Sequence, residues 1–148
     1  MVSVYLPVRK EELMMNSRKV QLLKLSFTIG TIADGIVAIN WFVIASGISI
    51  PNMLSGYSES GIGYQFAMYI AAIFMTGWTV ILFWGLQKPE ERKDLLIITA
   101  VLLLISIILE LIFFQEILIG TAFWIGVILR LLLIAKFSFS YFYSFQGK

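Results

Sequence analysis

Four long apolar stretches separated by short polar segments dominate the pattern of this chain. Each stretch is at least 20 residues long and lacks the regular alternation of apolar and polar positions found in water-facing elements. About 20 apolar residues in a helix are enough to cross the hydrocarbon core of a bilayer. The predicted membrane spans are residues 25–47, 62–87, 95–114 and 117–137.

The composition agrees with a membrane protein rather than a soluble domain. Hydrophobic residues make up 59% of the 148 positions, charged residues make up 14%, and the mean hydropathy is +0.91. So few polar residues are insufficient to cover a surface that faces water. We therefore expect an all-α integral membrane protein whose four transmembrane helices form one antiparallel bundle.

The segments outside the spans have a different character. Residues 1–24 mix basic and acidic side chains without the apolar run of a signal peptide, so they form either a short helix on the inner membrane surface or a frayed cytoplasmic tail. Residues 48–61 are rich in proline, glycine, asparagine and serine, which is typical of a loop. Residues 88–94 and 115–116 are predicted to be tight turns, and an aromatic tail follows residue 137.

The basic residues predict the orientation of these spans. Ten of the eleven lysines and arginines lie before the first span, in the turn around residue 90, or near the C-terminal end. The 48–61 loop and the 115–116 turn contain no basic residue. The positive-inside rule therefore places both termini in the cytoplasm, with the protein in the cell (plasma or inner) membrane.

Three ionisable side chains lie inside the predicted spans, where a charge is costly without a partner or water. At about 1.5 Å per residue, Asp34 lies roughly 13 Å and Arg130 roughly 11 Å from the inner boundary, which predicts an ion pair between them. Asn40 and Glu110 both lie roughly 22 Å from that boundary and form a second predicted polar layer. Thr76 falls between the two layers.

The sequence leaves the roles of these groups open. The predicted pair of Asp34 and Arg130 either fixes the register of the helices or lines a pocket for a charged solute, unless Arg130 extends towards the inner surface instead. Glu110 either remains a neutral carboxyl that donates a hydrogen bond to Asn40 or another neighbouring group, or it serves as a reversible proton site.

Two of the four tryptophans, Trp41 and Trp78, lie deep enough in their spans to line a cavity. Trp41 follows Asp34 by seven residues and so shares its helical face. These rings either form an aromatic cage for a cation or pack as ordinary core residues.

The residue types that are absent exclude several kinds of chemistry. Without cysteine or histidine there are no disulfides, thiolate nucleophiles, imidazole haem ligands or typical zinc sites, and we expect no metal, cofactor or catalytic residue. The chain has no glycine-rich phosphate loop or nucleophile elbow. It also lacks the basic cluster of a nucleic-acid-binding surface.

We therefore expect a non-enzymatic binding or transport module with a polar interior for a small or lipid-like solute. The main alternative is a structural or assembly subunit of a larger membrane complex, and a lipid-modifying enzyme is a third hypothesis. The expected partners are the lipid bilayer, such a solute, and a second copy or another membrane protein. The candidate binding or coupling residues are Asp34, Asn40, Trp41, Thr76, Trp78, Glu110 and Arg130.

Overall fold

The structure, a computed structural model, is all-helical in the part of the chain that it describes. It describes the backbone of residues 5–114 and 120–145, and the side chains from residue 17 onward within these ranges. The four helices are α1 (Tyr5–Ala45), α2 (Ile62–Gln87), α3 (Asp94–Phe113) and α4 (Thr121–Tyr143).

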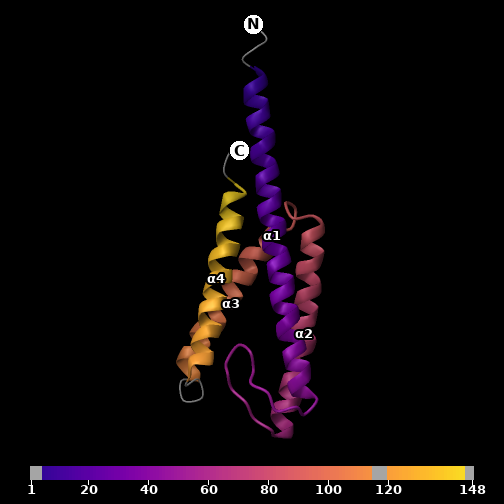
Figure 1. Ribbon diagram of the computed structural model, residues 1–148, viewed down its shortest axis with the longest axis vertical. Helices are drawn as coiled ribbons and strands as arrows, with labels where there is room; N and C mark the ends of the chain where they lie inside the picture. The colour runs from indigo at the N-terminus through magenta and orange to yellow at the C-terminus, as the bar shows by residue number, and fades with distance from the viewer. Residues whose placement is uncertain (1–4, 115–119, 146–148) are drawn as a thin grey trace.

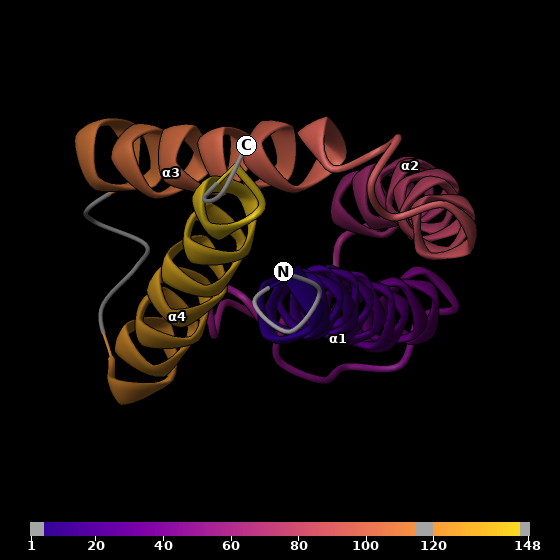
Figure 2. The same ribbon diagram turned by 90° about the horizontal axis from the view of Figure 1, so that it is seen from above.

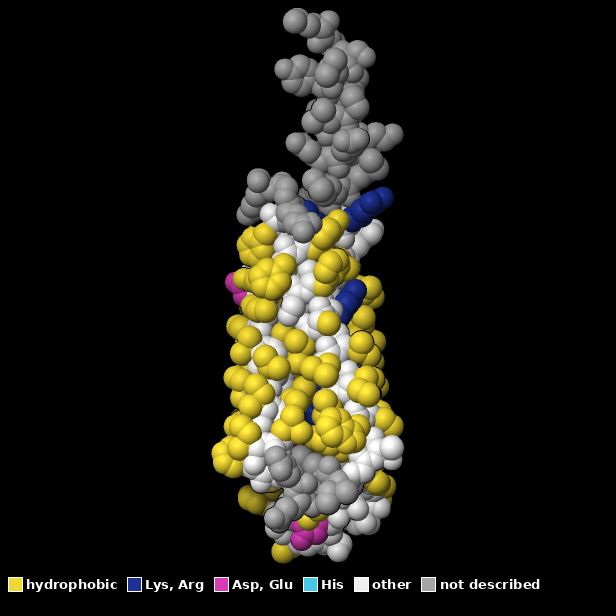
Figure 3. Space-filling model, turned by 90° about the vertical axis from the view of Figure 1, so that its left-hand side faces the viewer, with side chains coloured by type: hydrophobic (Ala, Val, Ile, Leu, Met, Phe, Trp, Pro, Cys, Tyr) yellow, Lys and Arg dark blue, Asp and Glu magenta, His cyan; other side chains and the backbone are white. Residues whose placement is uncertain are grey.

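All four helices are long and apolar enough to cross a membrane, which confirms that part of the prediction. In α1 this stretch is Ser17–Ala45. Large apolar side chains cover most of the outer face of the bundle, as Figure 3 shows for one side. Ile62, Phe74 and Phe113, for example, are 81%, 75% and 69% exposed. Such a surface is compatible with lipid rather than with water.

The ends of two helices differ from the predicted spans. Helix α1 begins at Tyr5 and continues without a break through the segment predicted as a tail or separate helix. No glycine or proline interrupts the sequence between residues 8 and 29, so nothing ends the helix there. Helix α4 continues to Tyr143, beyond the predicted end at residue 137. The turn at 115–116 and the predicted start of the fourth span at 117 lie outside the described residues.

The helices pack as two pairs. Helix α1 lies beside α2, and α3 crosses α4, while α4 also touches α1 (Figures 1 and 2). Helices α2 and α3 hardly touch, although only a short turn joins them. The bundle is therefore well packed within each pair and open along the side between α2 and α3.

One end of the bundle is closed by a tight core. Six side chains, contributed by all four helices and each at most 2% exposed, form this closed-end core: Leu23, Phe27, Leu82, Leu96, Ala100 and Phe137. In the same region a buried hydrogen bond of 2.5 Å joins the Ser26 and Ser140 hydroxyls. This bond satisfies two polar groups that would otherwise be costly to bury.

Gly85 allows α1 and α2 to approach closely at the closed-end core. The ring of Phe27 occupies the space in which a side chain at residue 85 would begin. Small residues commonly permit such contacts between membrane helices. Gly77 lies on the same helix, but a β-carbon added there would meet no neighbouring atom within 4 Å.

The substitution Gly85→Ala should destabilise the fold by about 1–3 kcal/mol, because its methyl group would displace the buried Phe27 ring. The matched control Gly77→Ala should be neutral or slightly stabilising, since alanine favours a helix more than glycine does. Thermal unfolding in detergent would compare the two variants. Equal stability of both would contradict this account of the α1–α2 contact.

Candidate functional site

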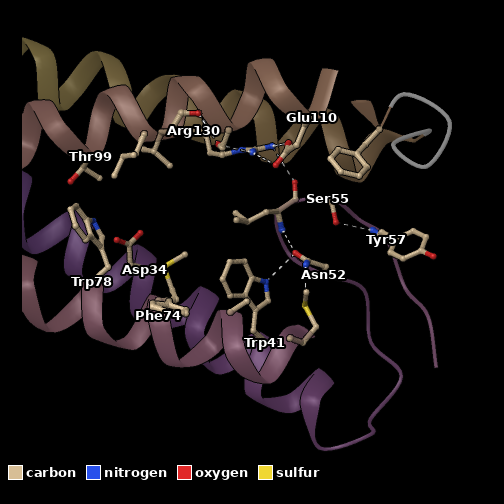
Figure 4. Close-up of a pocket in the computed structure, with 18 of the residues that line it drawn as sticks. Asp34, Trp41, Asn52, Ser55, Tyr57, Phe74, Trp78, Thr99, Glu110 and Arg130 are labelled. Atoms are coloured by element: carbon tan, nitrogen blue, oxygen red, sulfur yellow. Dashed lines mark hydrogen bonds and ion pairs between the residues drawn. The ribbon is translucent and has the colours of Figure 1, made fainter. Parts of the chain in front are cut away.

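A cavity of about 830 Å³ lies between the two helix pairs, beyond the closed-end core (Figure 4). Its walls come mainly from α2 and α3, with contributions from α1, α4 and the loop that joins α1 to α2. The volume lies within the range of sites that bind small organic molecules. Five of the seven candidate residues line this cavity: Asp34, Trp41, Trp78, Glu110 and Arg130.

The cavity extends to the apolar outer surface between α2 and α3. Phe74 of α2 and Leu102 and Phe114 at the other wall line the cavity, yet they are 75%, 49% and 51% exposed. Side chains that face both the cavity and the exterior mark its edge. Because α2 and α3 make few contacts, no packed seam separates the cavity from this side of the bundle.

The strongest polar interaction at the cavity joins Glu110 of α3 to Arg130 of α4. Nη1 of Arg130 donates to Oε1 of Glu110 at 2.8 Å, and Nη2 donates to Oε2 at 2.7 Å. The Arg130 side chain is 2% exposed and that of Glu110 is 24% exposed. Two parallel bonds between a guanidinium and a carboxylate form a strong and directional pair.

Three further acceptors surround the Arg130 guanidinium. Its Nε donates to the Gly126 carbonyl at 3.2 Å, Nη1 to the Ser106 hydroxyl at 3.4 Å, and Nη2 to the Leu54 carbonyl at 3.5 Å. A guanidinium has five N–H groups. With the two bonds to Glu110, each of the five has an acceptor within the protein. Arg130 therefore has no donor left for a ligand.

The Leu54 carbonyl reaches Arg130 because residue 126 is a glycine. A β-carbon at residue 126 would collide with that carbonyl. The loop between α1 and α2 thus packs directly on the backbone of α4. Gly56 of the same loop, with a positive φ of 69°, packs beside Ala122.

The predicted pair of Asp34 and Arg130 is wrong, because Arg130 binds Glu110 instead. The depth count assumed that the fourth helix ends at residue 137, but it continues to Tyr143. Counted from the actual ends, Arg130 lies roughly 20 Å along α4 and Glu110 roughly 24 Å along α3, so the two share a level. The alternative in which Arg130 extends towards the inner surface is wrong as well, because its guanidinium is buried against Glu110.

Asp34 lies on α1, across the cavity from the Arg130 guanidinium and close to Trp78 (Figure 4). Among the side chains that the structure describes, none forms a hydrogen bond or ion pair with Asp34. This carboxyl group faces the cavity without a protein partner.

The predicted hydrogen bond between Glu110 and Asn40 is also wrong. Glu110 accepts hydrogen bonds from Arg130, whereas Asn40 holds the loop. The Asn40 Nδ2 donates to the Pro51 carbonyl at 3.2 Å, and its Oδ1 accepts from the Met53 amide at 3.0 Å.

Thr76 is exposed and donates to the Ala72 carbonyl of its own helix at 2.8 Å. Asn40 and Thr76 are not among the residues that line the cavity.

Asn52, which the sequence analysis did not select, organises the loop at the cavity. Its Oδ1 accepts from the Trp41 indole at 3.2 Å and from the Leu54 amide at 3.0 Å, and its Nδ2 lies 3.5 Å from Met68 Sδ. Asn52 is only 8% exposed. Its position in a Pro-Asn loop sequence was the available signal, but that pattern is also typical of an ordinary turn.

Tyr57 lines the cavity from the same loop. Its hydroxyl donates to Oε2 of Glu59 at 2.8 Å. This hydrogen bond, together with desolvation and the negative charge of Glu59, raises the pKa of Tyr57 above its ordinary value. The phenol therefore stays neutral throughout the physiological pH range.

Within the described residues, no group of three or more acidic side chains is close enough to hold a metal ion. Comparisons of the chain with protein-family models, curated proteins and solved structures give no match.

A double-mutant cycle should show strong coupling between Glu110 and Arg130. Glu110→Gln and Arg130→Gln should each destabilise the fold by about 2–4 kcal/mol, because each leaves a buried or largely buried partner without its counter-charge. The double variant should regain a large part of that loss. Thermal unfolding in detergent would measure all three.

Asp34→Asn provides the matched control for this cycle, since it also neutralises a carboxyl in the cavity. Its effect should add to that of Arg130→Gln with a coupling energy near zero, because the two side chains do not interact. Coupling between residues 34 and 130 as strong as that between 110 and 130 would contradict the observed pairing.

Proposed function

We propose that this protein is a non-enzymatic binding or transport module that takes a small or lipid-like solute from the membrane into the cavity. The observation that supports this function is the cavity of about 830 Å³, which has polar groups inside and an apolar edge between α2 and α3. A solute with apolar parts could enter sideways from the bilayer, since Phe74, Leu102 and Phe114 at that edge are apolar.

We further propose that the four helices cross the membrane in alternating directions, with both termini in the cytoplasm. The start of α1 and the end of α4 lie at the same end of the bundle (Figure 1). The basic residues of the 88–94 turn and of both terminal regions favour the cytoplasmic side for that end. In this orientation the cavity and the loop of residues 46–61 belong to the outer half of the membrane.

The alternative of a structural or assembly subunit explains the Glu110–Arg130 pair, which would hold α3 against α4. It does not explain why Asp34 faces open space, because an uncompensated carboxyl contributes nothing to helix packing. A binding site gives that side chain a role. We therefore favour binding or transport over assembly.

Filling the cavity should abolish ligand uptake. Ala71 lines the cavity, whereas Ile73 lies on the opposite side of α2, is 45% exposed and is not among the residues that line the cavity. The neutral fluorescent probe Nile red should bind the protein in lipid nanodiscs, and Ala71→Trp should weaken its binding about tenfold or more by occupying the space. Fluorescence titration, corrected for empty nanodiscs, would measure the affinity.

Ile73→Trp is the matched control, because it adds a tryptophan side chain to α2 outside the cavity. Its affinity for Nile red should equal that of the unchanged protein. The proposed function would be wrong if Nile red gave no signal above empty nanodiscs, or if both tryptophan variants bound it as well as the unchanged protein.

A further inference from the structure

We infer that the cavity selects a lipophilic organic cation, for which Asp34 supplies the counter-charge and the aromatic side chains supply the walls. This inference rests on the proposed function and names the class of ligand. It follows from the balance of charge in the cavity, from the hydrogen bonds of Arg130, and from the position of the tryptophans.

The ionisable side chains that line the cavity are net acidic. They include two acids, Asp34 and Glu110, and one base, Arg130, with no other lysine or arginine among the lining residues that the structure describes. Glu110 and Arg130 neutralise each other through two short hydrogen bonds. The charge of an ionised Asp34 therefore remains for a ligand to balance.

Arg130 does not offer a competing site for an anion. It is 2% exposed, and its five N–H groups already have acceptors in Glu110, Ser106, Gly126 and Leu54. An anionic solute would have to displace the Glu110 carboxylate and would also meet Asp34. Both effects disfavour an anion in a region of low dielectric.

Aromatic side chains line the cavity near Asp34. Trp78 lies beside Asp34 in Figure 4 and Phe74 lies below it, and Trp41 lies further along the same cavity. The indole N–H of Trp41 is already bonded to Asn52, so its ring needs no polar partner from a ligand. The face of an indole ring attracts organic cations, and the attraction is greater away from water.

The remaining lining indicates how such a cation is built. Methionine, leucine and phenylalanine side chains make up much of the wall, including Met68, Met75, Leu103 and Phe74. A hydrated inorganic ion would lose its water there without gaining a set of oxygen ligands. A cation whose charge is shielded or spread over apolar groups loses far less solvation energy.

Two ions of nearly equal size and opposite charge provide the test. Binding of tetraphenylphosphonium and tetraphenylborate to the protein in nanodiscs would be measured by equilibrium dialysis, with empty nanodiscs subtracted. The unchanged protein should bind the cation at least about tenfold more tightly than the anion. Asp34→Asn should reduce this preference about tenfold, because it removes the uncompensated carboxylate while preserving the shape of the side chain.

The control Glu90→Gln removes an acid from the exposed turn between α2 and α3, and Glu90 is not among the residues that line the cavity. It should leave the preference for the cation unchanged. Trp78→Leu should weaken cation binding about threefold or more relative to anion binding, since leucine keeps an apolar wall but has no ring.

Equal binding of the two ions, tighter binding of the anion, or an unchanged preference in Asp34→Asn would each overturn the inference. Failure of both ions to bind would overturn it as well. Nile red then distinguishes an error in the proposed function from an error in the class of ligand. If its binding remains sensitive to Ala71→Trp, the binding function stands and only the class of ligand is wrong. If Nile red also fails, both are wrong.

Discussion

The burial of the Arg130 guanidinium is the constraint on which the open half of this bundle depends. A buried charge is tolerable only if its counter-charge and its hydrogen-bond acceptors are in place. Those acceptors come from α3, from α4 itself and from the loop between α1 and α2. One side chain therefore links three segments through polar contacts, and apolar contacts alone are weakly specific within lipid.

The distribution of packing follows from this arrangement. The closed-end core uses interlocking apolar side chains and one pair of serines, whereas the other half uses the arginine and a loop. Between these two regions α2 and α3 separate, and the cavity results. The cavity thus lies between an end that is held by apolar packing and an end that is held by the hydrogen bonds of Arg130.

The four helices could be predicted from the sequence because length and apolar character alone determine them. The partner of Arg130 could not, because that prediction depended on where α4 ends, and its last turns are as aromatic as a surface tail. A signal did exist: Ser106 and Glu110 are four residues apart on one face of α3, and both contact Arg130. The role of Leu54 could not be foreseen, since a backbone carbonyl leaves no mark on the sequence.

The length of α1 has a mechanical consequence. Its 41 residues extend roughly 60 Å, about twice the thickness of the hydrocarbon core, and its first turns project past the other helices in Figure 1. The same helix carries Asp34 and Trp41 in the wall of the cavity. A continuous helix behaves as a lever, so a tilt of about 10° at the cavity would move a point roughly 30 Å away by about 5 Å. A small tilt of α1 beside the cavity would therefore appear as a larger displacement at the far end of the helix.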